Sequence, residues 1–122
     1  MPSSTFERYG GFSAVSRVVM TFYELVLDSD EVGHHFDDID MPRLIDHQTK
    51  FISSLMGGPS AMSDDRLKAV HQTVPITDAD FDEIGKLLAE AMAKHGMSEG
   101  DISQVVASVE SKRPLIVNRA TA

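Results

Sequence analysis

The sequence contains no cysteine and no tryptophan, and basic residues are scarce. Without cysteine, the chain cannot form disulfides, thiolate metal sites, a thiolate nucleophile or a thioether link to a cofactor. Lysine and arginine total 11 against 19 aspartates and glutamates, so the formal net charge is −8. A charge of this sign excludes nucleic acid and anionic membranes as favoured partners. The five histidines are then the main candidates for metal chemistry.

Long hydrophobic runs are also missing. The longest strongly apolar stretch covers residues 18–23, which is far too short to span a bilayer. Residues 1–10 have no apolar run and include Glu7, so they do not look like a targeting segment. We therefore expect a cytoplasmic protein. Its 122 residues have room for one domain, 1–122, in which residues 1–5 and 115–122 are expected to be frayed ends.

What the sequence does contain is helical periodicity along nearly its whole length. Apolar residues recur at spacings of three and four, and side chains suited to helix starts precede several of these stretches. Ser13, Asp40, Thr77 and Ser98 are the expected N-caps. The fold class predicted is all-α, with five or six helices. The expected helices cover about residues 13–27, 31–36, 40–57, 66–72, 77–96 and 98–114.

Most groups of titratable residues have a structural explanation. The alternating aspartates in 78–82 resemble the start of a calcium loop, but Glu83 stands where such a loop needs glycine. The adjacent pair His34-His35 is better read as part of a solvated loop, because neighbouring side chains rarely face one point. His95 falls in the last turn of an expected helix, where a cation suits the helix dipole.

Two histidines, His47 and His71, are not explained in this way. Without regard to the surrounding motifs, His71 would be expected in the core and His47 at the boundary between core and surface. Their context is a series of short motifs in a fixed order. The markers are Gly10-Gly11, Phe22-Tyr23, Phe36, 41–44 with His47-Gln48, Phe51, 55–59, 67–71 and Ile76-Thr77 followed by Phe81. From about Phe6 to Val109, this series resembles the group I truncated haemoglobins, whose fold is a two-over-two helical sandwich around haem.

The resemblance implies a role for individual residues. His71 matches the proximal ligand of the haem iron, while Tyr23 and Gln48 match distal hydrogen-bond donors to a bound gas. His47 lies at the edge of the haem-facing stripe, where two roles stay open: a distal iron ligand, or a contact with a haem propionate. The residues expected to hold the cofactor are Phe22, Phe36, Leu44, His47, Ile52, Leu67, His71, Ile76, Phe81 and Ile84.

Each distal donor also has a plainer interpretation. Tyr23 would otherwise be a core tyrosine bonded to a backbone carbonyl, and Gln48 an exposed polar residue. The chain departs from many family members in having Met62 and Asp64 before the short helix at 66–72, and we expect a propionate contact to be missing there. No histidine follows Val109, so covalent attachment near the C-terminus is not expected, and the cofactor implied is non-covalent haem b.

The function implied is haem-based binding of O2, NO, CO or similar gases by a monomer or weak homodimer. NO dioxygenation to nitrate, or a peroxidase-like activity, would need an external reductase, because the sequence has no flavin or nicotinamide motif. The alternative is a six-coordinate, bis-histidine haem protein for electron transfer or for redox or gas sensing. A third interpretation assigns a different class of function: a helical interaction domain that binds no cofactor.

Overall fold

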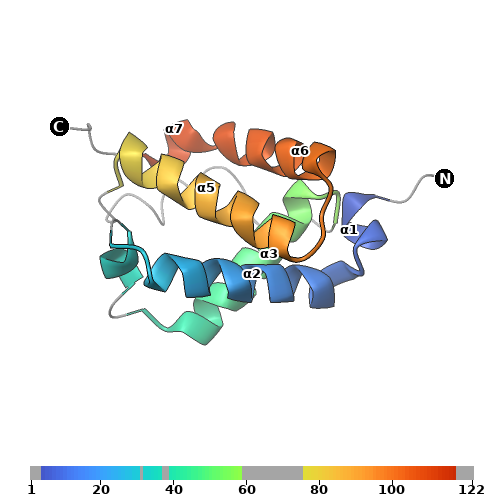
Figure 1. Cartoon of the computed structure of the whole chain (residues 1–122), viewed down its shortest axis with the longest axis horizontal. Coiled ribbons are helices and arrows are strands. Elements are labelled where there is room, and N and C mark those ends of the chain that lie inside the picture. Colours follow the sequence, from blue (N-terminus) through green and yellow to red (C-terminus); the bar gives the residue numbers. More distant parts are fainter. Residues whose placement is uncertain (1–3, 31, 37–38, 59–75, 118–122) are drawn as a thin grey trace.

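The computed structural model describes residues 4–30, 32–36, 39–58 and 76–117 (Figure 1). Every element in this part of the chain is helical, as the periodicity predicted. None of these helices combines the length and the apolar character needed to cross a bilayer. The elements are α1 (Thr5–Arg8), α2 (Gly11–Leu27), the 3-10 helix η1 (Gly33–Phe36), α3 (Met41–Leu55), α5 (Asp78–Lys94), α6 (Glu99–Glu110) and α7 (Arg113–Ile116).

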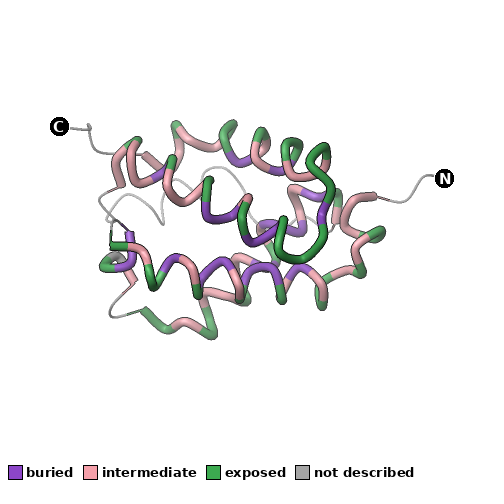
Figure 2. Tube along the Cα trace, viewed as in Figure 1, coloured by how far each residue is buried: buried purple, intermediate pink, exposed green. Residues whose placement is uncertain are grey.

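The long helices form two layers. Helices α5 and α6 lie side by side, and α2 packs against both α3 and α5 (Figure 1). The buried positions of α2, α5 and α6 lie on the sides of these helices that face one another (Figure 2). On α2, Val15, Val19, Phe22 and Val26 follow one another at helical spacing and are all buried. A single apolar core therefore lies between the layers.

Three of the four predicted N-caps are confirmed. The side chains of Asp40, Thr77 and Ser98 each accept a hydrogen bond from a backbone N–H three residues later. At α5 the bond is reciprocal, because the carboxylate of Asp80 also accepts from the N–H of Thr77 at 3.2 Å. These caps depend on residues close together in the chain, which is why the sequence could predict them.

The predicted cap at Ser13 is wrong. Helix α2 begins two residues earlier, at Gly11, and its N-cap is Gly10 with a φ of 107°. A left-handed backbone favours glycine, and the Gly10-Gly11 pair supplies it in the turn that joins α1 to α2. Ser13 instead lies inside the helix, where its hydroxyl accepts a hydrogen bond from Arg17 at 3.1 Å.

Helix α1, which the periodicity did not predict, is held by the start of α6. The hydroxyl of Tyr9 donates to Asp101 at 2.7 Å and accepts from the N–H of Ser98 at 3.0 Å. Arg8 forms an ion pair with the same aspartate at 2.9 Å. Together, Arg8 and Tyr9 lower the pKa of Asp101 to about 2. Ser4 and Thr5, expected in a frayed end, are here the N-cap and first residue of α1.

Helices α3 and α5 end in the same glycine motif. Past the end of α3, the N–H of Gly58 donates to the carbonyl of Ser53 at 2.8 Å. Past the end of α5, the N–H of Met97 donates to the carbonyl of Met92 at 3.2 Å. The glycines that make these turns, Gly57 and Gly96, have φ values of 88° and 82°. Both helices therefore end at the predicted glycine turns, two residues before the predicted bounds of 57 and 96.

These two glycines should differ in their tolerance of alanine. Gly57→Ala and Gly96→Ala each force a non-glycine residue into the left-handed region, at a cost of about 1–2 kcal/mol. A Cβ at Gly57 would also lie 2.9 Å from Cβ of Ser4, whereas one at Gly96 would meet nothing within 4 Å. Urea unfolding should therefore show the larger loss of unfolding free energy for Gly57→Ala. Equal losses would mean that α1 moves aside without cost.

Candidate functional site

The candidate site begins with an aromatic cluster at one end of α2. The rings of Phe22 and Tyr23 meet edge to face, with centroids 4.8 Å apart. The Tyr23 ring also meets Phe36 of η1 at 5.6 Å. Because Phe36 belongs to a separate element, η1 contributes one wall of the site. Three residues named from the sequence are therefore brought into contact.

The hydroxyl of Tyr23 makes no hydrogen bond to another described residue. The side chain is only 4% exposed, and within the described ranges its hydroxyl has no hydrogen-bond partner. Burial raises the pKa of Tyr23 well above its ordinary value, so the phenol stays protonated at neutral pH. The alternative interpretation was a core tyrosine that donates to a backbone carbonyl. No carbonyl of a described residue accepts a hydrogen bond from Tyr23. A donor in such a place fits a polar ligand atom brought in from outside.

Helix α3 presents the next set of predicted residues. Leu44 and Gln48 are one turn apart, and both are partly buried, as is His47. Side-chain hydrogen bonds to Gln48 and His47 are absent within the described part of the chain. The opposite face of α3 is exposed and carries the ion pair between Asp46 and Lys50 at 3.1 Å. Gln48 therefore does not have the fully exposed position that its plainer interpretation requires.

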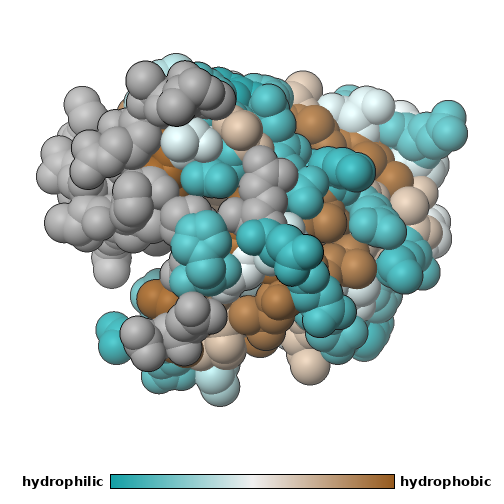
Figure 3. Space-filling view, turned by 60° about the vertical axis from the view of Figure 1, so that its left-hand side comes forward, coloured by the Kyte–Doolittle hydropathy of each residue, from teal (hydrophilic) through white to brown (hydrophobic). Residues whose placement is uncertain are grey.

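The remaining walls are apolar. Phe81 on α5 and Ile52 on α3 are buried, while Ile76 and Ile84 are partly buried. All the described residues predicted to line the site, apart from His47, are in the core or packed against it: Phe22, Phe36, Leu44, Ile52, Ile76, Phe81 and Ile84. In Figure 3, hydrophobic side chains also appear at the surface between hydrophilic ones. Such walls suit a large, flat, apolar group.

Other predicted residues fall outside the ranges that the structure describes. The proximal candidate His71 and the pocket residue Leu67 belong to 59–75, as do Met62 and Asp64. Their roles remain predictions. Within the described ranges, no three histidine or acidic side chains come together as ligands of a bare metal ion. A prosthetic group held by one histidine needs no such cluster.

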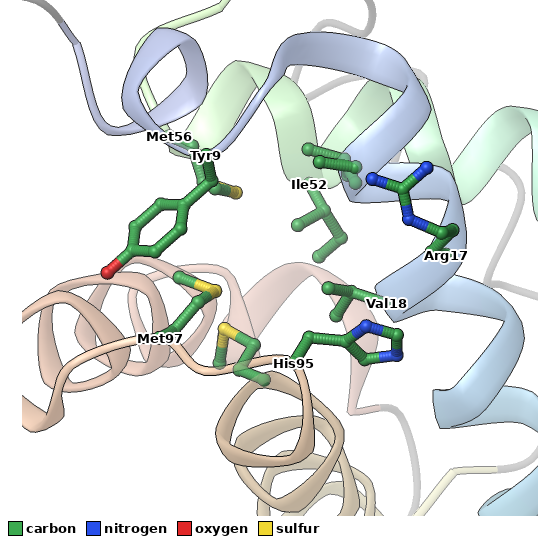
Figure 4. Close-up of a pocket in the computed structure, with 10 residues that line it drawn as sticks. Tyr9, Arg17, Val18, Ile52, Met56, His95 and Met97 are labelled. Carbon is green, nitrogen blue, oxygen red and sulfur yellow. The ribbon is translucent and has the colours of Figure 1, made fainter.

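A cavity of about 80 Å3 is lined on α2 by residues that lie five to nine positions before Tyr23, and its lining was not predicted from the sequence (Figure 4). Among the described residues, Ile52 is the one lining residue that also belongs to the predicted pocket. His95 lines the cavity and its Nε2 lies 2.7 Å from the hydroxyl of Thr21, which ties α5 to α2. The lining residues are Tyr9, Ala14, Val15, Arg17, Val18, Ile52, Met56, Met92, His95 and Met97.

Comparison with known proteins agrees with this geometry. The sequence pattern of the bacterial-like globins matches residues 4–118. Over 112 residues the chain is 29% identical to the group I truncated haemoglobin of Tetrahymena pyriformis, covering 92% of this chain and 93% of the relative. Over 115 residues it is 30% identical to the group I truncated haemoglobin GlbN of Mycolicibacterium paratuberculosis, covering 94% and 85%.

Solved structures give the same result. The Fe(III) form of the Tetrahymena pyriformis protein superposes with a TM-score of 0.87 at 26% identity, over 96% of this chain and all of that one. The 2/2 haemoglobin of Synechococcus sp. PCC 7002, solved in the cyanomet state with covalently attached haem, gives 0.86 at 30% identity with the same coverage. The two-over-two sandwich predicted from the sequence is thereby confirmed.

The chain therefore belongs to the bacterial-like globins and, within them, to the group I truncated haemoglobins. Membership of this family supports haem-based binding of small gas molecules. The unused phenol of Tyr23 and the apolar walls beside it fit a haem with a polar gas ligand.

Proposed function

We propose that this protein binds haem b non-covalently through His71 and holds a diatomic gas with Tyr23 and Gln48. The single observation that carries the proposal is the hydroxyl of Tyr23, which is unpartnered within the described ranges and lies on a buried side chain against Phe36. A ferrous haem supplies an iron that binds O2, NO or CO reversibly. Non-covalent attachment follows from the lack of any histidine after Val109.

The residues of the chain would act on the gas in three ways. Tyr23 donates a hydrogen bond from its protonated hydroxyl, and Gln48 donates a second from its amide. Phe22, Ile52 and Phe81 exclude water from the site, which strengthens both bonds. The imidazole of His71 needs an acceptor for its second nitrogen, and a backbone carbonyl one turn earlier, near Leu67, would supply it.

The same donors would suit NO dioxygenation, in which NO, O2 and one electron yield nitrate. Tyr23 and Gln48 would stabilise the negative charge that develops on the oxygen during this reaction. The electron would come from an external reductase, which we propose as a partner of a cytoplasmic monomer or weak homodimer. Consumption of NO by the oxygenated protein, with nitrate as the product, tests this activity separately from gas binding.

His47 decides between gas binding and the six-coordinate alternative. We expect its partly buried imidazole to turn away from the iron, which leaves the sixth position open to a gas. Ferric and ferrous absorption spectra of the hemin-loaded protein should then be high-spin, and His47→Leu should leave them unchanged. Low-spin spectra that become high-spin in His47→Leu would assign the electron-transfer or sensing role instead. Folded protein that gives no Soret band with hemin would favour a cofactor-free interaction domain.

A further inference from the structure

Helix α7 is fastened to the first turns of α5 by one side chain, Arg113. Its guanidinium forms ion pairs with Asp78 at 2.8 Å, with Asp82, and with Glu110 at 2.7 Å. The same group also donates from Nε to Glu110 at 2.9 Å. Three carboxylates therefore converge on one arginine whose side chain is 24% exposed. The planar fork of arginine can serve several acceptors at once in a way that lysine cannot.

Arg113 also covers a residue of the candidate haem pocket. The guanidinium carbon lies 4.5 Å from the centre of the Phe81 ring, which is within the range of a cation–π contact. Phe81 is 4% exposed, so its ring is enclosed by Arg113 together with the core. The arginine thereby restricts how this ring can move.

Arg113 also restrains the start of α5. Thr77, which forms a reciprocal cap with Asp80, is the N-cap of this helix. Asp78 and Asp82, which Arg113 binds, lie one and five residues after Thr77. The helix that carries Phe81 is therefore held at its first turns by the same side chain that covers the Phe81 ring.

From these contacts we infer that Arg113 is a positioning residue for haem: it fixes Phe81 and the start of α5, which form one side of the candidate pocket. This inference rests on the proposed function. It assigns a role in cofactor retention to a side chain about forty positions beyond the proposed proximal ligand, which contacts Phe81 among the described pocket residues.

The test compares two arginines that make similar contacts at different places. Arg8 also binds a carboxylate, that of Asp101, and lies 5.7 Å from the centre of the Tyr9 ring. Arg113→Met should speed transfer of hemin to excess apomyoglobin by about tenfold, because a cation–π contact and its ion pairs are lost beside the pocket. Arg8→Met should lower stability without changing that rate, and Arg113→Lys should fall between wild type and Arg113→Met.

Two further readouts separate positioning from general stability. The Fe–His stretching band of the ferrous protein should shift or broaden in Arg113→Met and stay unchanged in Arg8→Met. In the apoprotein, amide hydrogen exchange in the first turn of α5 should accelerate in Arg113→Met only. If Arg113→Met does not fold, Arg113→Lys and Asp78→Asn provide the same comparison.

The outcomes distinguish this inference from the proposed function. If wild type binds hemin but Arg113→Met and Arg8→Met match it in hemin transfer and in the Fe–His band, the inference is overturned and the proposed function stands. If wild-type protein does not bind hemin, the proposed function fails, and the inference falls with it. If amide hydrogen exchange in the first turn of α5 is unchanged or slower in Arg113→Met, that result would also contradict the inference that Arg113 fixes this turn.

Discussion

Replacing His71 by glycine should abolish stable haem binding. The imidazole is the expected axial ligand of the iron, and glycine removes it without adding any group that could take its place. Hemin added to His71→Gly should give a broad, weak Soret band and should be lost readily on gel filtration. Added imidazole should restore a sharp spectrum, because the free base can occupy the space that the side chain has left.

A second histidine provides the matched control for this result. His95 lines the cavity beside Thr21, away from the aromatic cluster at Tyr23, and no iron ligation is expected of it. His95→Ala should therefore keep the wild-type spectrum, and added imidazole should not change it. A wild-type spectrum in His71→Gly would show that another side chain binds the iron, and the proposed proximal site would have to be abandoned.

Tyr23→Phe should release O2 about 10- to 100-fold faster than wild type. A hydrogen bond to a partly charged acceptor contributes ~1.5–3 kcal/mol, and phenylalanine keeps the ring but removes the donor. The ring contacts of Tyr23 with Phe22 and Phe36 should survive the change, so the pocket should keep its shape. Stopped-flow measurement of the O2 dissociation rate from the ferrous protein gives the effect directly.

The chain contains one other tyrosine, which makes the comparison specific. Tyr9→Phe removes the bonds to Asp101 and to the N–H of Ser98, far along the sequence from the pocket. That variant should lose stability while its O2 dissociation rate stays at the wild-type value. If Tyr9→Phe and Tyr23→Phe release O2 at the same rate, the hydroxyl of Tyr23 does not stabilise the bound gas.

Local signals in the sequence predicted most of the fold. The caps at Asp40, Thr77 and Ser98 depend on bonds that reach only three residues, so residue type and spacing were enough. Helix α1 was missed because four residues make no periodic pattern. Helix α1 is held by Tyr9 and Arg8, which donate hydrogen bonds to the carboxylate of Asp101, more than ninety positions away in the sequence. Such a partner becomes visible only when the layers are assembled.

Some residues of the candidate site could be predicted from the sequence and others could not. Residues with a characteristic motif, such as Phe22-Tyr23, could be named from the sequence, and the structure places Tyr23 against Phe36. The contact of Arg113 with Phe81 joins two helices through a side chain that belongs to no motif. The 80 Å3 cavity lined by His95 could not be predicted either, because its volume depends on how Val18, Ile52 and Met92 pack together.

The three methionines around that cavity give it a built-in set of spectroscopic probes. Met56 ends α3, Met92 lies in the last turns of α5 and Met97 in the turn that follows it, and each is at least nine-tenths buried. Their terminal methyl groups, labelled with carbon-13, would give sharp NMR signals sensitive to any small molecule that enters the space between them. Met20, half exposed on α2, does not line the cavity and would serve as the internal reference. Titrating dissolved xenon while following these four resonances would therefore show whether a small apolar atom enters this cavity.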